Sequence, residues 1–170
     1  LPTITGTLSV CSGSTTTLTG SGIPDPTTPW ASSNLAVATV NNSGVVTGVS
    51  AGTTVITYKS SNNCTITATV TVNGLPNNIS NGFSATTICF GGTPLLTFDA
   101  ENSSFSTPYS VTYRNDITLT QYTATIPNAS AYNFTAGDNP TSNSGYTIVS
   151  ISNAFCTRTS GFTDSGANLT

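Results

Sequence analysis

Apolar and polar residues alternate in short runs along the chain. In its first half, residues 37–40, 45–47, 53–58 and 64–72 alternate apolar side chains with threonine and other small residues, and Asn, Ser and Gly are concentrated between the runs. A period of two predicts strands with one buried and one wet face, and the intervening residues favour tight turns. No amphipathic helical pattern is seen. The pattern therefore predicts an all-β chain with consecutive strands joined by short turns.

Threonine occupies every second position between residues 65 and 71, and apolar residues alternate with it up to residue 72. A regular row of hydroxyl groups on one strand face suits binding to ice or another crystalline surface. The simpler interpretation is that the apolar residues face the core while the threonines cover the wet side of an antiparallel sheet. We favour the simpler interpretation.

Two further runs in the second half also predict strands. Tyr109, Val111 and Tyr113 fall on one face of the first run. In the run over residues 145–156, apolar residues occupy both faces, with Tyr146 and Ile148 on one and Val149 and Ile151 on the other. Burial on both faces predicts a central strand.

The chain contains two copies of one motif. Residues 11–19 and residues 89–97 both read C-x-G-x-T-x-x-L-T, and their first positions lie 78 residues apart (89 − 11). An aromatic residue follows each copy at a similar distance, Trp30 in the first and Tyr109 in the second, and we expect each to begin a core strand. A period of this length is typical of domains in tandem rather than of a solenoid. We expect modules at residues 1–73 and 74–170, with a linker at residues 73–78.

Four cysteines, Cys11, Cys64, Cys89 and Cys156, lack both CxxC spacing and any histidine that would complete a zinc site. Disulfide bonds are the better interpretation, and four cysteines permit three pairings. Because two folded modules do not easily share crossed bridges, we expect Cys11 to pair with Cys64 and Cys89 with Cys156. Bridges of this kind imply an oxidising, extracellular compartment.

Charged residues make up only 5% of the chain, and its net charge is −3. With three cations in all, the sequence has no basic stripe to neutralise phosphates, so we expect no nucleic-acid partner. No apolar run is long enough to cross a bilayer, and we expect no membrane insertion. A signal peptide and an initiating Met are both missing, which indicates a mature segment or an excised fragment.

The order of short motifs at residues 30–34, 37–40, 44–48 and 51–57 closely resembles bacterial Ig-like domains of group 2, over roughly residues 13–73. The segments at 86–92, 108–113 and 145–156 resemble repeats of gliding-motility and related surface proteins, and the cysteine pair looks like a variant seen in large adhesins of the Bacteroidetes. These resemblances imply two tandem immunoglobulin-like β-sandwiches that act as stalk repeats. By analogy with the immunoglobulin fold, Trp30 would pack against a bridge between Cys11 and Cys64.

Candidate chemistry is sparse. The absence of histidine excludes Ser-His-Asp and Cys-His nucleophile systems, and the six acidic residues are scattered over predicted loops, so we expect no enzyme and no cofactor. For these acids calcium is the metal considered, with oxygen ligands from Asp99 and Glu101 together with Asn102, from Asn115 and Asp116, or from Asp138 and Asn139; solvated side chains are the simpler interpretation. Some aromatic residues would suit stacking on sugar rings, although core packing is the default; they are Phe105, Tyr122, Tyr132 and Phe134.

The leading hypothesis is a structural or adhesive repeat segment of a large secreted bacterial surface protein, a stalk or filament located outside the cell. Its partners would be neighbouring modules of the same chain, extracellular polysaccharide, or further copies in a filament. One alternative is a binding head for polysaccharide or another surface, formed by the loops at 101–108 and 136–145, with Glu101, Phe105, Asp138 and Asn139 as contacts. Another is a spacer module of a secreted carbohydrate-active enzyme.

Overall fold

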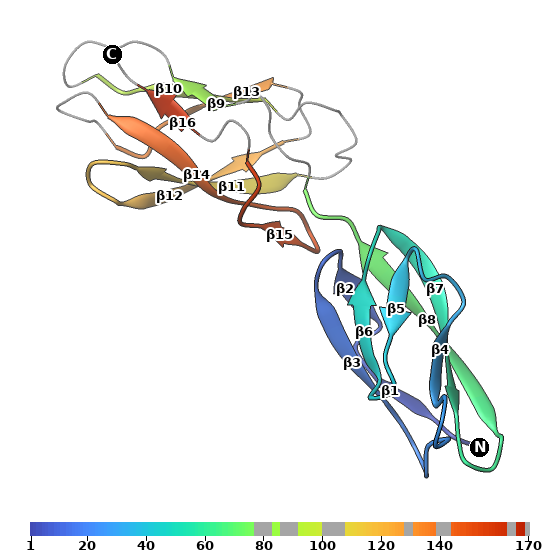
Figure 1. Cartoon of the computed structure of the whole chain (residues 1–170). Helices are drawn as coiled ribbons and strands as arrows, with labels where there is room; N and C mark the ends of the chain where they lie inside the picture. The colour runs from blue at the N-terminus through green and yellow to red at the C-terminus, as the bar shows by residue number, and fades with distance from the viewer. Residues whose placement is uncertain are drawn as a thin grey trace. The chain divides into compact units, whose positions relative to one another are not determined.

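The computed structural model describes residues 1–76, 83–85, 92–99, 108–127, 131–138, 144–162 and 166–168. Every regular element in these residues is a β-strand, which confirms the all-β prediction (Figure 1). The chain divides into two compact units, Leu1–Gly74 and Leu75–Thr170. Each unit is built from two sheets that enclose a core of its own.

The first unit consists of two four-stranded sheets. One has the order β1 (Ile4–Gly6), β3 (Thr15–Gly20), β6 (Val45–Gly48) and β5 (Ala38–Val40), and the other has the order β2 (Ser9–Cys11), β8 (Thr65–Asn73), β7 (Gly52–Lys59) and β4 (Trp30–Ser32). The four strands that alternation predicts here are confirmed to within one residue at each end. Asn73, expected in the linker, closes β8 instead: its carbonyl oxygen accepts the Ser12 N–H at 2.9 Å.

The core of the first unit forms between its sheets. Trp30 begins β4 and is buried against Tyr58 of β7, with ring centroids 4.7 Å apart. A methyl group on Gly20 would overlap the Tyr58 ring, so this position requires glycine for the two sheets to approach closely. The other buried apolar residues of this core are Val10, Leu18, Ala38, Val46, Ile56, Val70 and Val72.

The threonine row of β8 lies on the outside of the first unit. Thr65, Thr67, Thr69 and Thr71 are exposed, whereas the residues that alternate with them are buried or half-buried. β8 pairs antiparallel with β7 over eight residue pairs, from Gly52 with Val72 to Lys59 with Thr65. The simpler interpretation, a wet threonine face over an apolar core face, is therefore confirmed.

The predicted disulfide arrangement is wrong. β2 pairs in parallel with the end of β8, which puts Cys11 beside Asn73, while Cys64 precedes the start of β8. Nine residues of extended strand separate the two positions by roughly 30 Å, whereas the Cα atoms of a disulfide lie about 4.4–6.8 Å apart. Cys64 is an exposed free thiol.

The disulfide-bonded cysteines of the described residues are Cys11 and Cys156. Neither Cys11 with Cys64 nor the expected scheme of one internal bridge per module holds, and Cys89, the expected partner of Cys156, lies outside the described residues. Trp30 accordingly packs against a tyrosine ring and not against a bridge.

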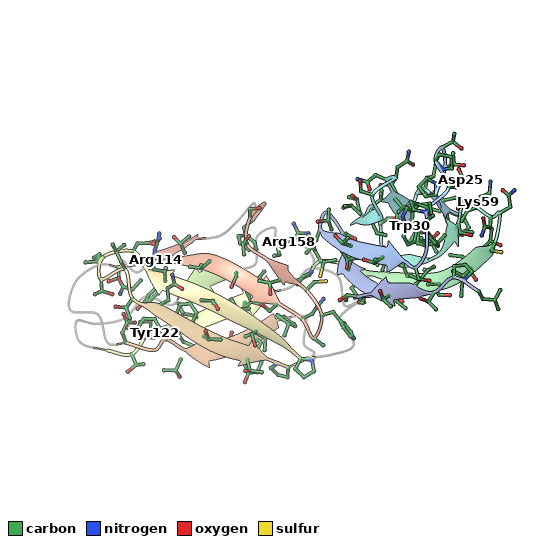
Figure 2. The ribbon with its side chains drawn as sticks, turned by 90° about the horizontal axis from the view of Figure 1, so that it is seen from below. Asp25, Trp30, Lys59, Arg114, Tyr122 and Arg158 are labelled. Carbon is green, nitrogen blue, oxygen red and sulfur yellow. The ribbon has the colours of Figure 1, made fainter. Side chains whose placement is uncertain are left out.

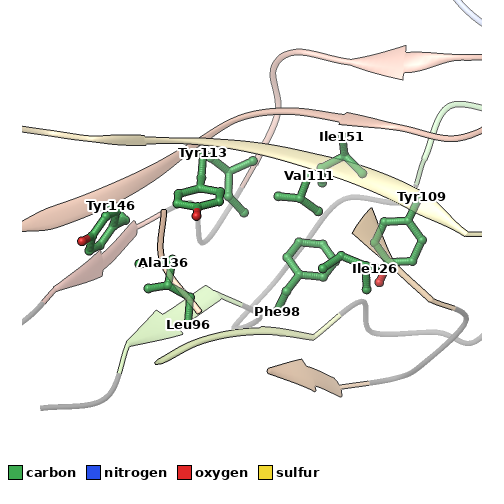
Figure 3. Close-up of a cluster of buried hydrophobic side chains, with 10 residues drawn as sticks. Leu96, Phe98, Tyr109, Val111, Tyr113, Ile126, Ala136, Tyr146 and Ile151 are labelled. Atoms are coloured by element: carbon green, nitrogen blue, oxygen red, sulfur yellow. The ribbon is translucent and has the colours of Figure 1, made fainter. Parts of the chain in front are cut away.

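The second unit also has two sheets in its described residues. The smaller has the order β13 (Ala131–Thr135), β10 (Leu95–Asp99) and β9 (Phe83–Ala85). The larger has the order β12 (Gln121–Ile126), β11 (Tyr109–Asn115), β14 (Gly145–Ser152) and β15 (Thr157–Arg158), and β16 (Gly166–Asn168) pairs with β14 beside β15. Tyr109, Val111 and Tyr113 all point from β11 into the core, as predicted (Figure 3). They meet Leu96 and Phe98 of the smaller sheet.

β14 is a central strand, but not because both of its faces are buried. Tyr113 pairs with Ile148 and Thr112 pairs with Ser150, so Val149 is an extra residue in β14. A β-bulge of this kind resets the alternation of side chains along a strand. Tyr146, Ile148 and Ile151 therefore all belong to the one core, and the prediction of two buried faces is wrong.

We predict that Cys64 reacts with a maleimide in the native, unreduced protein, because its thiol is exposed and unbonded. Peptide mapping of the labelled protein should recover the adduct at Cys64. Cys64→Ser should change the free energy of unfolding by no more than about 0.5 kcal/mol, as expected of an exposed position. Recovery of a peptide that links Cys11 to Cys64 would contradict this assignment.

Candidate functional site

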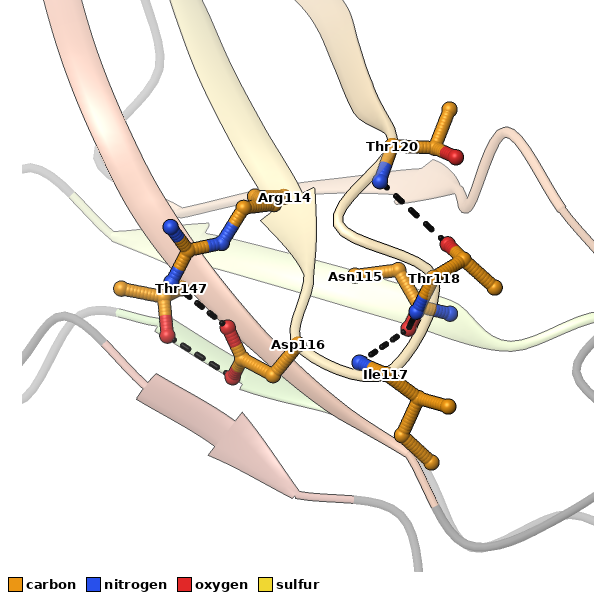
Figure 4. Close-up of polar contacts among 7 residues, drawn as sticks. All are labelled: Arg114, Asn115, Asp116, Ile117, Thr118, Thr120 and Thr147. Atoms are coloured by element: carbon orange, nitrogen blue, oxygen red, sulfur yellow. Dashed lines mark hydrogen bonds and ion pairs between the residues drawn. The ribbon is translucent and has the colours of Figure 1, made fainter.

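The hairpin between β11 and β12 is fixed by a buried asparagine. Asn115 is only 1% exposed, and its Oδ1 accepts the backbone N–H groups of Ile117 at 2.8 Å and Thr118 at 3.1 Å (Figure 4). Its Nδ2 donates to Oδ2 of Asp138 at 2.7 Å. The side chain thus satisfies loop donors that have no strand partner and ties the hairpin to the segment after β13.

The carboxylate of Asp116 holds the hairpin to the neighbouring strand, β14. Asp116 accepts a hydrogen bond from Nη2 of Arg114 at 3.2 Å and one from Oγ1 of Thr147 at 2.8 Å (Figure 4). Its own N–H donates to the carbonyl oxygen of Gly145 at 2.8 Å. Because Gly145 pairs with Asn168 of β16, the hairpin lies at the end of the unit where the last described strand also ends.

The hairpin presents two aliphatic side chains to solvent. Ile117 is 57% exposed and Leu119 is 63% exposed. Leu119 also has a φ of 59°, a left-handed conformation that costs a residue with a β-carbon about 1–2 kcal/mol and that glycine adopts freely. We call Ile117 and Leu119 the hairpin tip. Nothing in the alternation of the sequence singled out this tip, because it lies between two predicted strands.

Asp138 is an acceptor within a group of tyrosines. The Tyr146 hydroxyl donates to Oδ1 of Asp138 at 2.7 Å, and the Tyr113 hydroxyl accepts the Gly137 N–H at 2.9 Å. Burial, then the hydrogen bond and the charge of Asp138, raise the pKa of Tyr146 far above its usual value. Burial is also the main cause that raises the pKa of Tyr113. Both phenols therefore stay neutral, and Tyr146 remains a donor.

Of the four predicted ligand contacts, only Asp138 is described; Glu101, Phe105 and Asn139 lie outside the described residues. Asp138, considered for calcium together with Asn139, instead contacts Asn115, and both of its carboxylate oxygens accept hydrogen bonds from the chain itself. No cluster of three or more His, Cys, Asp or Glu occurs in the described part of the chain.

Two of the aromatic residues considered for sugar stacking are packed in the core layer. Tyr122 stacks on Tyr113 with ring centroids 5.7 Å apart, and Tyr132 packs against the same core. The side chain of Phe134 is outside the described part. The described elements also include no helix that would be long and apolar enough to cross a membrane.

The first unit carries an apolar pocket at the end where β3 stops and β4 begins. Its volume is about 200 Å³, and the rings of Trp30 and Tyr58 line it together with Leu18. Pro24 and the turn residues Asn42 and Ser43 also line it. Ile4 of β1 pairs with Gly20 at this end, so the pocket lies beside the first strand of the unit. We call it the Trp30 pocket.

An ion pair holds one wall of the Trp30 pocket. Lys59 Nζ lies 2.9 Å from Oδ2 of Asp25, whose side chain is 9% exposed (Figure 2). Oδ1 of Asp25 accepts the N–H groups of Thr27 and Thr28, each at 2.9 Å. The hydrogen bond from Lys59, then those from the two backbone groups, hold the pKa of Asp25 well below its usual range. The sequence analysis did not recognise this role of Asp25, because in the sequence Asp25 is only an acidic residue in a predicted loop.

We predict that the chain loses stability in acid through Asp25. Its pKa is lower in the folded than in the unfolded chain, so its contribution is complete above the unfolded pKa of about 3.9 and is lost as pH falls towards the folded pKa. Thermal unfolding followed between about pH 6 and pH 2 should show a falling Tm below about pH 4. Asp25→Asn should remove much of this slope, and Asp116→Asn, at a more exposed ion pair, serves as the control. Equal slopes for Asp25→Asn and the parent would contradict the assignment.

Comparison with known protein families gives a match within the first unit. Residues 3–74 match the family model of the bacterial Ig-like domain (group 2). This confirms the resemblance stated for the first module. None of the curated proteins compared matches the chain.

Solved structures of an S-layer protein are also similar to this chain. Domains 4 and 5 of the S-layer protein SbsC share 14% identity with a TM-score of 0.40, and the match covers 99% of this chain and 97% of that chain. The S-layer protein rSbsC(31-844) shares 16% identity with a TM-score of 0.37, over 92% of this chain. The matched part is 23% of that S-layer chain, so this chain spans about a quarter of its length.

Proposed function

We propose that this chain is a structural segment of a large secreted bacterial surface protein, in which Ig-like modules form part of a stalk or filament outside the cell. The observation that carries the proposal is the match of residues 3–74 to the bacterial Ig-like domain family. The complete two-sheet sandwich of the first unit supports it, since such a module needs no partner strand to close its core.

The charges of the chain support a passive role. Lys59 pairs with Asp25, Arg114 pairs with Asp116, and Nε of Arg158 donates to the carbonyl oxygen of Pro76 at 2.6 Å. These are the only three cations in the sequence. A chain that uses its cations to hold its own loops keeps few of them for an anionic partner, and its stability rests little on exposed ion pairs that external salt screens.

The same reasoning extends to chemistry. The sequence has no histidine, and the acids whose side chains the structure describes, Asp25, Asp116 and Asp138, each accept hydrogen bonds from neighbouring groups of the chain. We therefore propose a non-enzymatic segment that needs no cofactor, with neighbouring Ig-like modules as its first partners. The finer roles of adhesin repeat and gliding-motility filament belong to the same proposal.

The proposal is tested by locating the segment on cells and by asking whether it binds anything. We expect an antibody against the segment to label intact, unpermeabilised cells of the producing bacterium, and external protease to remove that label. An antibody against a cytoplasmic protein serves as the control. Labelling that requires permeabilised cells would contradict an extracellular location.

The second arm separates a stalk from an adhesive head. Beads that carry many copies of the segment supply avidity and are offered arrays of polysaccharides and abiotic surfaces. A structural segment should show no saturable binding above that of beads carrying heat-unfolded protein. Saturable binding to one polysaccharide class would instead identify a binding head.

A further inference from the structure

The hairpin tip in the second unit has features of a binding element. Leu119 occupies a left-handed conformation at which glycine or asparagine would be less strained, and 63% of its surface is in contact with solvent. The backbone conformation of Leu119 closes the hairpin, since its N–H donates to the Asn115 carbonyl oxygen, but the exposed leucine side chain adds strain that glycine would not. The presence of leucine at this position points to a use outside the unit. Asn115 and Asp116 hold the loop in place, which lowers the ordering cost of binding.

The Trp30 pocket in the first unit has the matching features of a receptor. Its volume is about 200 Å³, and aromatic rings and Leu18 line it. An apolar cavity of about 150 Å³ accommodates benzene, so this pocket has room for a branched aliphatic side chain. Gly20 lies against the Tyr58 ring, and a side chain there would displace that ring.

The charged groups at the edges of the two surfaces do not repel one another. The hairpin tip adjoins the ion pair of Arg114 with Asp116 and the carboxylate of Asp138, which accepts a hydrogen bond from Asn115. The pocket adjoins the ion pair of Lys59 with Asp25, next in sequence to Tyr58 and Pro24. Bringing the two surfaces together therefore meets no net repulsion, and it buries apolar area on both sides.

We propose that the hairpin tip of one copy of this chain inserts into the Trp30 pocket of a second copy. The tip lies beside the last described strand of its unit and the pocket beside the first strand of its own unit. The two surfaces differ, so the contact is heterologous: a pair of copies keeps one free tip and one free pocket, and the association extends from copy to copy. The contact does not depend on where the parent protein is located, so its test is independent of the proposed function.

The contact is small. Two side chains bury far less than the roughly 1,200–2,000 Å² of a stable protein interface, so the Kd of one contact should be on the order of 1 mM. Such a contact becomes effective when many copies are held side by side, because avidity multiplies weak sites.

The sole tryptophan of the chain, Trp30, reports on the pocket directly. In NMR spectra of the ¹⁵N-labelled chain, the Trp30 indole signal and the hairpin amides should shift together as the concentration rises from about 0.1 mM to about 2 mM. Leu119→Asn should weaken the association roughly tenfold or more, since it removes the aliphatic side chain that the contact would bury. Leu35→Asn is the matched control, because Leu35 is 64% exposed in the first unit and lines neither surface.

A mixing experiment tests the direction of the contact. Labelled Leu119→Asn keeps its pocket but lacks the leucine of the hairpin tip. Unlabelled parent protein should therefore shift its Trp30 indole signal, and unlabelled Leu119→Asn should shift it far less. Ser43→Phe, which fills the pocket rim from an exposed position, should abolish the shift when it is the labelled chain. Thermal unfolding shows that each variant is folded, and Leu119→Asn should melt at or above the temperature of the parent because asparagine tolerates the left-handed conformation.

Four results would overturn the proposal. One is a Trp30 signal that does not change up to about 2 mM. Another is a concentration dependence that Leu119→Asn leaves intact, which would place self-association elsewhere. The third is a fall in the Tm of Leu119→Asn by several degrees, which would show that Leu119 serves the packing of its own unit. A Trp30 shift caused by soluble oligosaccharides at constant protein concentration would assign the pocket to a sugar instead.

Discussion

In each unit, alternate apolar side chains of paired strands pack between two sheets. This packing fixes the positions of the turns that carry the pocket and the hairpin tip. In the first unit the contact between Trp30 and Tyr58 joins β4 to β7 and requires glycine at position 20. Each fully buried large apolar side chain contributes about 1.5–3 kcal/mol, which a chain with few ion pairs depends on. The pocket and the hairpin tip both lie at sheet ends, where strands stop and turns begin.

A few polar side chains fix the turns by hydrogen bonds, as apolar packing fixes the sheets. Asp25 accepts two backbone N–H groups and Lys59 at one end of the first unit. Asn115 and Asp138 act together at one end of the second unit. Because buried polar groups are costly unless they are paired, these residues fix the loops around them. Low overall charge and well-defined loops are therefore compatible in this chain.

Strand alternation predicted the first unit well, because its strands face a core on one side and water on the other. β5 to β8 end within one residue of their predicted bounds. The disulfide could not be predicted, since the parallel pairing of β2 with the far end of β8 has no local signal and puts Cys11 away from Cys64. The bulge at Val149 was also invisible, because one extra residue reverses the apparent faces of a strand. The hairpin tip was recognised from the φ angle of Leu119, which the alternation of apolar and polar residues does not predict.

The central claim is that the fold of the first unit depends on its sheet core and not on an internal bridge. Hydrogen exchange of the fully reduced chain, compared with the oxidised chain, tests this most directly. We expect the paired amides of β7 and β8 to remain protected after reduction, because Cys64 is already a free thiol and the ladder from Gly52 to Lys59 contains no cysteine. Loss of that protection on reduction would contradict the claim, because it would show that the fold of the first unit depends on the disulfide bond of Cys11.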